Sequence, residues 1–147
     1  MPRITPFLWF DNNADEAIHF YLSVFKDSKR LDVHSFDDAG KGAVSSRTFE
    51  LDGRRFIAFN GGPHFKFNEA ISFVVDCEDQ QEIDFYWNAF IAGGGHESQC
   101  GWLKDKFGVS WQIVPKNIAD LLSRPGAMQA MMTMKKLDIS ALKAAAN

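Results

Sequence analysis

An internal repeat constrains the fold of this chain more than any other feature of its sequence. When residues are compared at a separation of 65, one acidic position and four apolar positions recur. The matched pairs are Asp11 with Asp76, Ile18 with Ile83, Phe20 with Phe85, Tyr21 with Tyr86 and Phe25 with Phe90. In each copy an apolar run precedes the acidic residue, and apolar residues at helical spacing follow it. A supersecondary unit that occurs twice is the simplest cause of this match.

The first copy continues with three strand-like runs after its helix. They cover residues 29–36, 43–51 and 54–60. Asp52-Gly53 stands between the last two runs and is typical of a tight hairpin. This order of elements predicts a module of the form strand, helix and three strands.

The second copy has the same order in a shorter form. Gly93-Gly94-Gly95 ends its helix, because glycines commonly stop helices there. A short run at 96–99 and a final hairpin follow. We therefore predict an α+β fold of two tandem βαβββ modules, residues 1–62 and 68–115, which form a curved mixed sheet around a cavity.

Residues 116–147 predict a C-terminal helical extension. Asn117 is a fair N-cap for a short helix, and Arg124-Pro125-Gly126 interrupts the chain. Four methionines then supply a soft apolar surface: Met128, Met131, Met132 and Met134. Such a surface packs either on the edge of the sheet or on a partner subunit.

The final hairpin of the second module allows a prediction of strand register. Asp105 and Gly108 fit the first and last positions of a four-residue type I turn. Counting outward, this turn pairs Lys104 with Val109, Leu103 with Ser110, Trp102 with Trp111 and Gly101 with Gln112. Because strand side chains alternate between faces, we expect the two tryptophans on one face. Gly101, Leu103, Ser110 and Gln112 then share the other face.

Composition narrows the class of protein. The chain has 147 residues, 46% of them hydrophobic, and a net charge of −3, which fits one compact domain or two small fused modules. It has no basic stripe of the kind that phosphate backbones require, so a nucleic-acid partner is not expected. The sequence has no long apolar run and no signal-peptide pattern, so we expect no membrane partner and a cytoplasmic location. The two cysteines, Cys77 and Cys100, are expected to be buried free thiols.

Four stretches of sequence carry a resemblance to a known family. They are Ile-Thr-Pro-Phe-Leu-Trp-Phe from Ile4, Asn-Gly-Gly-Pro-His-Phe-Lys-Phe-Asn-Glu-Ala-Ile-Ser-Phe from Asn60, Gln-Cys-Gly-Trp-Leu-Lys-Asp from Gln99 and Met-Lys-Lys-Leu-Asp-Ile from Met134. With the repeated module they resemble the PhnB-like family named 3-demethylubiquinone-9 3-methyltransferase. This family lies within the vicinal oxygen chelate superfamily, which includes glyoxalase, bleomycin-resistance proteins and extradiol dioxygenases. Departures from the family pattern are a short segment at 37–43 and the triple glycine before His96.

The resemblance implies where a metal would lie if this chain held one. The superfamily's metal enzymes carry His, Gln or Glu ligands on the first and last strands of each module, and those positions here correspond to Pro6, Ala58, Ala70 and Gln112. A divalent ion requires several converging oxygen or nitrogen donors, and only Gln112 has one. We therefore predict no metal and no cofactor.

The family name implies a methyltransferase, and the sequence bears on this point. Nucleotide-like methyl donors are typically held by a strand, a glycine-rich turn and a helix N-terminus. Here the first strand leads into Asp11-Asn12-Asn13, which has no glycine. The residues therefore do not predict a methyl-donor site.

A small-molecule cavity is the functional feature that this register predicts. Small side chains leave room in it, and a few polar groups stand among apolar ones, as ligand pockets require. The predicted ligand-binding residues are Leu8, Phe10, Ala58, Asn60, Ala70, Ser72, Gly101, Ser110 and Gln112, with Pro6 beside them. The alternative is that these side chains merely interlock to close a barrel.

Three residues are candidates for catalysis, each with a structural alternative. His64 could act as a general base, or it could order its loop. Glu69 could be a buried carboxylate at the mouth of the pocket, or a solvated or ion-paired residue. Cys100 could be a reactive thiol, although the sequence shows no activating group beside it.

Two functions follow from these residues. The first is a metal-independent small-molecule-binding protein with an unassigned ligand. The alternative is a metal-independent enzyme that acts on a small organic substrate, with His64 or Glu69 as acid or base. The resemblance and the methionine surface further imply a homodimer.

Overall fold

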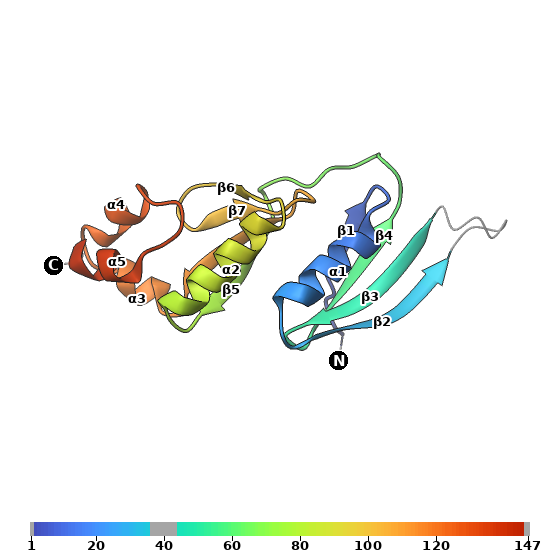
Figure 1. Cartoon of the computed structure of the whole chain (residues 1–147), viewed down its shortest axis with the longest axis horizontal. Helices are drawn as coiled ribbons and strands as arrows, with labels where there is room; N and C mark the ends of the chain where they lie inside the picture. The colour runs from blue at the N-terminus through green and yellow to red at the C-terminus, as the bar shows by residue number, and fades with distance from the viewer. Residues whose placement is uncertain (1, 36–43, 146–147) are drawn as a thin grey trace. The chain divides into compact units, whose positions relative to one another are not determined.

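The computed structural model describes residues 2–35 and 44–145 and divides into two compact units. The units are Met1–Phe67 and Asn68–Asn147, and each is described by itself (Figure 1). Each holds a four-stranded mixed sheet, with strand order β1-β4-β3-β2 in the first and β5-β8-β7-β6 in the second. The predicted α+β fold of two βαβββ modules is therefore confirmed.

The described residues of the first unit form four strands and one helix. They are β1 (Phe7–Phe10), α1 (Ala14–Val24), β2 (Ser28–Ser35), β3 (Ser45–Leu51) and β4 (Arg54–Asn60). Asp52 and Gly53 both have positive φ, 53° and 74°, as the predicted Asp-Gly hairpin between β3 and β4 requires. Residues 36–43 lie outside the described residues. They include Phe36 and Ala43, where two predicted strand-like runs end and begin, and the short segment at 37–43.

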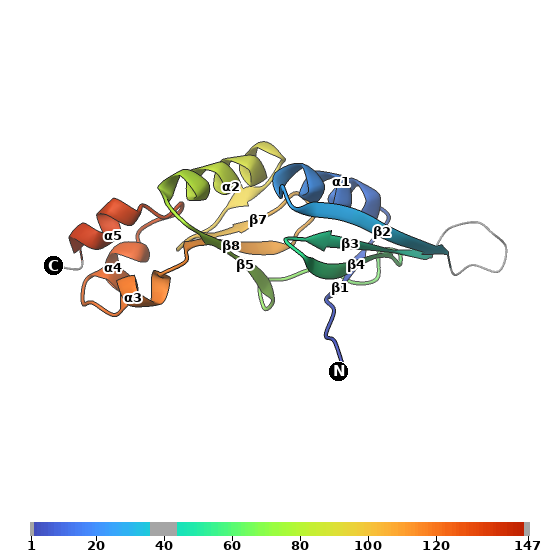
Figure 2. The same ribbon diagram turned by 90° about the horizontal axis from the view of Figure 1, so that it is seen from below.

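Helix α1 covers one face of the first sheet (Figure 2). Tyr21 of α1 stacks on Phe49 of β3 with ring centroids 6.2 Å apart. Phe10 of β1 and Ala58 of β4 are buried on the same face. The opposite, helix-free face carries side chains that include Phe7 and Phe59, whose ring centroids lie 5.2 Å apart.

Four strands and four helices occur in the part of the second unit that the structure describes. They are β5 (Ser72–Cys77), α2 (Gln80–Ala92), β6 (His96–Glu97), β7 (Trp102–Lys104), β8 (Ser110–Pro115), α3 (Ile118–Leu122), α4 (Ala127–Met131) and α5 (Ile139–Ala145). The side chain of Asp79 caps α2 by accepting a hydrogen bond from the Glu82 N–H at 3.0 Å. Gly93 follows the helix, as predicted, and donates its N–H to the Ala89 carbonyl. None of the helices in the described part of the chain is long and apolar enough to cross a membrane.

The hairpin between β7 and β8 differs from the predicted register by one residue. Its observed pairs are Trp102 with Gln112, Leu103 with Trp111 and Lys104 with Ser110. Asp105 pairs with Val109, because the Asp105 N–H donates to the Val109 carbonyl at 2.9 Å. Because Asp105 and Val109 pair, the loop between the two strands is one residue shorter than predicted. Gly108, with φ of 94°, is the bulge residue of this loop.

A buried carboxylate holds this shorter loop. Asp105 is almost fully buried and accepts hydrogen bonds from the N–H groups of Phe107 and Val109 and from the indole Nε1 of Trp111. The corrected register places Leu103 and Trp111 on the face that α2 covers, where Trp111 packs against Phe90. The predicted stacking of the two tryptophans on one face is therefore wrong. Trp102 shares the helix-free face with Gln112.

The C-terminal residues 134–139, here named the strap, are fastened to the second unit by main-chain hydrogen bonds. The N–H groups of Cys100 and Gly101 donate to the carbonyls of Met134 and Lys135, each at 2.8 Å. The Gln80 amide donates to the Leu137 carbonyl and accepts from the Ile139 N–H. The strap is thus part of the second compact unit, while the boundaries 1–62, 68–115 and 116–147 stay predictions.

Gly101 provides a test of how the strap packs. A Cβ there would lie 3.0 Å from Leu137 and 3.1 Å from the Ile113 carbonyl, and its φ is 85°. We expect Gly101→Ala to lower the free energy of unfolding by about 2 to 4 kcal/mol, from a left-handed alanine and from crowding. Chemical denaturation measures this change.

Gly94→Ala is the matched control in the same unit. Gly94 has φ of 100°, but a Cβ there would meet only the flexible Lys106 side chain, at 3.3 Å. Its expected cost is about 1 kcal/mol, from the backbone alone. Equal losses in the two variants would show that the strap does not press on Gly101.

Candidate functional site

The helix-free face of the second sheet carries a row of polar side chains. Lys104 of β7 lies opposite Ser110 of β8, and Ser110 lies opposite Ser72 of β5. Since cross-strand partners point to the same face, the three side chains are neighbours. We name Lys104, Ser110 and Ser72 the polar row. His96 of β6 extends the row by register, opposite Lys104.

A second row lies two residues along the strands. It contains Trp102, Gln112 and Val74, which are also paired across the sheet. The indole of Trp102 is half-buried, and Val74 is 53% exposed. This row joins an apolar surface to the single amide of Gln112.

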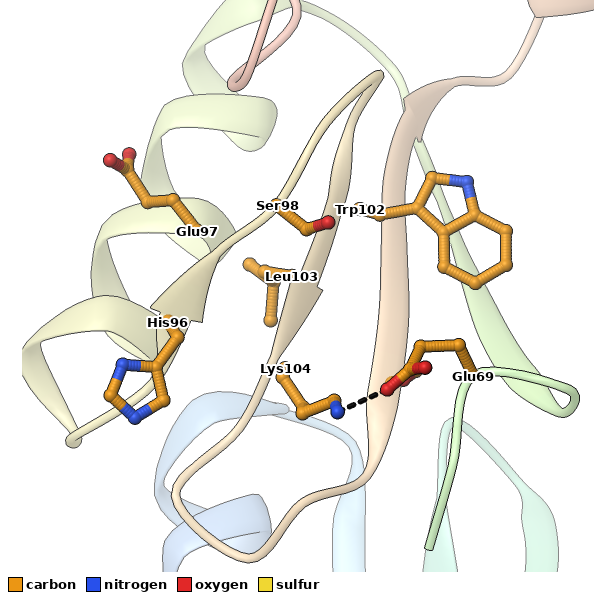
Figure 3. Close-up of a pocket in the computed structure, with 8 residues that line it drawn as sticks. Glu69, His96, Glu97, Ser98, Trp102, Leu103 and Lys104 are labelled. Carbon is orange, nitrogen blue, oxygen red and sulfur yellow. Dashed lines mark ion pairs between the residues drawn. The ribbon is translucent and has the colours of Figure 1, made fainter.

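A partly open pocket of about 250 Å³ lies over these strands. Its lining residues are Glu69, His96, Glu97, Ser98, Trp102, Leu103, Lys104 and Ser110. Figure 3 shows Lys104 and Glu69 pointing toward each other, while His96 points away from Lys104. The Glu97 carboxylate accepts a hydrogen bond from the indole of Trp87 on α2 at 2.8 Å. Glu97 is thereby held toward the helix, whereas Glu69 contacts Lys104 of the polar row.

Glu69 and Lys104 form an ion pair at the edge of this pocket. Their side chains are 63% and 39% exposed. The hydrogen bond from Lys104, followed by its positive charge, holds the pKa of the Glu69 carboxyl below its usual range. Glu69 is therefore ionised at neutral pH, and its exposed pair with Lys104 stabilises the fold little.

The hydroxyl groups of the polar row are available as donors. Gln112 donates its amide Nε2 to the Ser72 Oγ at 3.0 Å, so Ser72 acts there as an acceptor. Ser110 is 2% exposed. Across residues 2–35 and 44–145, neither Ser72 nor Ser110 donates its hydroxyl hydrogen to a protein acceptor. The row therefore presents two hydroxyl donors beside one ammonium group.

The predicted cavity residues of the first unit lie on the helix-covered face. Leu8, Phe10 and Ala58 are buried there. The Asn60 Oδ1 accepts a hydrogen bond from the Ala14 N–H at 2.9 Å and so caps α1. The prediction of which side chains of β1 and β4 face the cavity is wrong by one residue. It was made by counting from the helix and not from the strands themselves. These four side chains have structural roles beneath α1.

The internal repeat could have shown which side chains of β1 point to the helix-free face. The separation of 65 that relates the two helices also relates Phe7 to Ser72 and Leu8 to Phe73. Ser72 lies on a helix-free face, so the repeat assigns Phe7 to the equivalent face of its own sheet. Phe7 is exposed there, as this relation requires.

Ala70 and Gly101 do not leave room beside the pocket. Ala70 precedes β5 in an exposed turn, where its N–H donates to the Asn68 side chain at 2.9 Å. Gly101 faces Leu137 of the strap, as described above. Of the predicted ligand-binding residues, Ser72, Ser110 and Gln112 are brought together on one helix-free face.

The three catalytic candidates occupy different surroundings. His64 belongs to the first unit, in an exposed loop, with its ring centroid 6.4 Å from that of Trp9. Cys100 is half-buried and has φ of 61°, a strained conformation that its N–H bond to the strap supports. Glu69 lines the pocket. Burial raises the pKa of the other thiol, Cys77, to about 12, so Cys77 is unreactive at neutral pH.

The implied metal positions do not fit a divalent ion. Pro6, Ala58 and Ala70 have no side-chain oxygen or nitrogen, and Ala58 faces α1. Within the described parts of the chain, no three His, Cys, Asp or Glu side chains gather closely enough to hold a metal. The absence of a metal and of a cofactor stays a prediction.

The fold places this chain in the vicinal oxygen chelate superfamily. The fosfomycin resistance protein FosX from Listeria monocytogenes has the same fold, with a TM-score of 0.62 and 13% identity over 84% of this chain and 98% of that chain. A protein from Pseudomonas aeruginosa is similar, with a TM-score of 0.64 and 19% identity over 78% of this chain and 98% of that chain.

Sequence comparison defines the family. The chain belongs to the 3-demethylubiquinone-9 3-methyltransferase family, whose model matches residues 2–114. A PhnB protein from Bacillus cereus is 33% identical, with a TM-score of 0.67, over 77% of this chain and 99% of that chain. No curated protein matches the sequence.

Proposed function

We propose that this protein binds a small organic molecule on the helix-free face of its second sheet. The observation that carries the proposal is the polar row of Lys104, Ser110 and Ser72 beside the half-buried indole of Trp102. Lys104, Ser110 and Trp102 line a pocket, and Ser72 lies beside Ser110 on the same face of the sheet. A few converging polar groups next to an aromatic surface are what orient and bury a small ligand. The site is metal-independent in this proposal.

The surroundings of Glu69 favour binding over catalysis. Glu69 is the one predicted catalytic candidate that lines the pocket. Its ion pair with Lys104 keeps it ionised, which makes it a poor general acid near neutral pH. Among the described residues that line the pocket, no hydroxyl or thiol is hydrogen-bonded to a histidine, as an activated nucleophile would be. Methyl transfer, which the family name suggests, is not part of the proposal.

Replacing Trp102 tests the proposal. In a thermal-shift screen of small aromatic acids, amides and amines, we expect compounds that raise the melting temperature of the native protein. Trp102→Ala should weaken their binding about fivefold or more, since aromatic contacts and burial at a pocket are worth at least about 1 kcal/mol. Isothermal titration calorimetry of the best compounds measures the loss.

Phe85→Ala is the control for this experiment. Phe85 is an exposed aromatic residue of α2 that does not line the pocket. Its replacement should leave binding unchanged. The proposal is contradicted if the compounds bind Trp102→Ala as tightly as they bind the native protein, or if no compound binds at all.

We also propose that the protein is a cytoplasmic homodimer. Met128 of α4 and Met132, the C-cap residue of α4, are 45% and 63% exposed, which gives an apolar surface that a second copy could cover. Sedimentation velocity should show a dimer at micromolar concentration, and Met128→Gln with Met132→Gln should shift it toward monomer. A monomer of the native protein would contradict the proposed dimer.

The proposed cytoplasmic location is tested separately by cell fractionation.

A further inference from the structure

We infer that the ligand of this site carries an oxyanion, a carboxylate or a phosphonate, attached to a flat apolar group, and that Glu69 occupies the place of that oxyanion when no ligand is bound. This inference rests on the proposed function and names its ligand class. It follows from the donors of the polar row, from the Glu69–Lys104 ion pair and from the position of Trp102.

The polar row is rich in hydrogen-bond donors. Lys104 supplies an ammonium group, and Ser110 and Ser72 supply hydroxyl hydrogens that no described protein acceptor takes. Neighbouring side chains across strands lie about 4.5–5.5 Å apart at Cβ, which is close enough for one group to contact two of them. A carboxylate or phosphonate has the several acceptor oxygens that such a row can satisfy.

The Glu69 carboxylate shows that Lys104 already binds an oxyanion. Glu69 reaches Lys104 from the exposed turn before β5. Glu69 is 63% exposed and Lys104 is 39% exposed, so solvent screens their pair and it contributes little stability. A ligand can therefore displace Glu69 at small cost. A bound oxyanion would keep the ion pair to Lys104 and would add hydrogen bonds from the serine hydroxyls.

The second row, which contains Trp102, determines the chemical nature of the rest of the ligand. Trp102 lies two residues from Lys104 on β7, which is a distance of about 7 Å along a strand. An apolar group attached directly to the oxyanion can therefore reach the indole. Two other polar side chains that line the pocket do not compete, because Glu97 is held toward α2 by Trp87 and His96 points away from Lys104 (Figure 3). These dimensions suit a molecule of the size of benzoate or phenylphosphonate.

The first experiment compares probes of one shape and different charge. We expect benzoate and phenylphosphonate to bind the native protein at least tenfold more tightly than benzamide or benzylamine, as measured by calorimetry. Lys104→Gln should remove this preference. Lys106→Gln is the matched control, since Lys106 lies on the exposed turn outside the pocket and its replacement changes the net charge equally.

The second experiment removes the internal competitor. Glu69→Gln should strengthen the binding of benzoate and phenylphosphonate about three- to tenfold, because a neutral amide holds Lys104 less strongly than a carboxylate. Glu78→Gln is its control: Glu78 forms a similar exposed ion pair with Lys116, and its loss should leave affinity unchanged. The same comparison for benzamide should show no gain.

The outcomes separate this inference from the proposed function. Suppose that benzamide or benzylamine binds as tightly as benzoate and that Trp102→Ala abolishes that binding. The proposed binding site is then supported, and the inference that the ligand carries an oxyanion is contradicted. If Glu69→Gln weakens the binding of both acids, Glu69 is a ligand contact, and its role as a competitor is overturned. If neither acid binds the native protein or Glu69→Gln, the inference fails.

Discussion

The second unit depends on the close contact of two backbone segments at Gly101. The N–H groups of Cys100 and Gly101 donate to the strap, and the Gly101 carbonyl accepts from the Ile113 N–H at 2.8 Å. Leu137 fills the space that a side chain at position 101 would need, and it is fully buried in a cluster with Val114 and Leu142. The chain enters β7 directly after this contact. The strap thus fixes where β7 begins, at Trp102, and so positions the strand that carries Trp102 and Lys104 on the binding face.

This contact also explains two of the sequence stretches that carry the family resemblance. The stretch from Gln99 and the stretch from Met134 lie far apart in the sequence, yet they are hydrogen-bonded to each other. One supplies a glycine with positive φ and the start of β7, and the other supplies the carbonyls and Leu137. Both serve the packing of the second unit, and of their residues Trp102, Leu103 and Lys104 line the pocket.

The sequence predicted the elements of the fold because their signals are local. Helical spacing, the Asp52-Gly53 hairpin and the glycines after α2 each specify a structure within a few residues. The register of β7 and β8 was predicted wrongly because it depends on Asp105, whose buried hydrogen bonds select the shorter loop. The buried face of β1 could not be identified from the sequence, because apolar residues such as Leu8 and Trp9 occur on both of its faces. Alternation of apolar and polar residues therefore gives no signal.

The candidate site was predicted only in part for the same reasons. Ser72, Ser110 and Gln112 were predicted to face the cavity, but the register error placed Trp102 on the opposite face. Asn60 looked like a pocket amide, and its role as the cap of α1 arises from a contact 46 residues away in sequence. Such long-range hydrogen bonds cannot be seen in a local pattern.

Nuclear magnetic resonance mapping of the binding face tests the central claim most directly. In a titration of isotopically labelled native protein with phenylphosphonate, the account predicts the largest amide shifts at Glu69, Ser72, Trp102, Lys104, Ser110 and Gln112. Leu8, Phe10, Ala58 and Asn60, which lie beneath α1, should not shift. Largest shifts at those four residues, or none in the second sheet, would contradict the account.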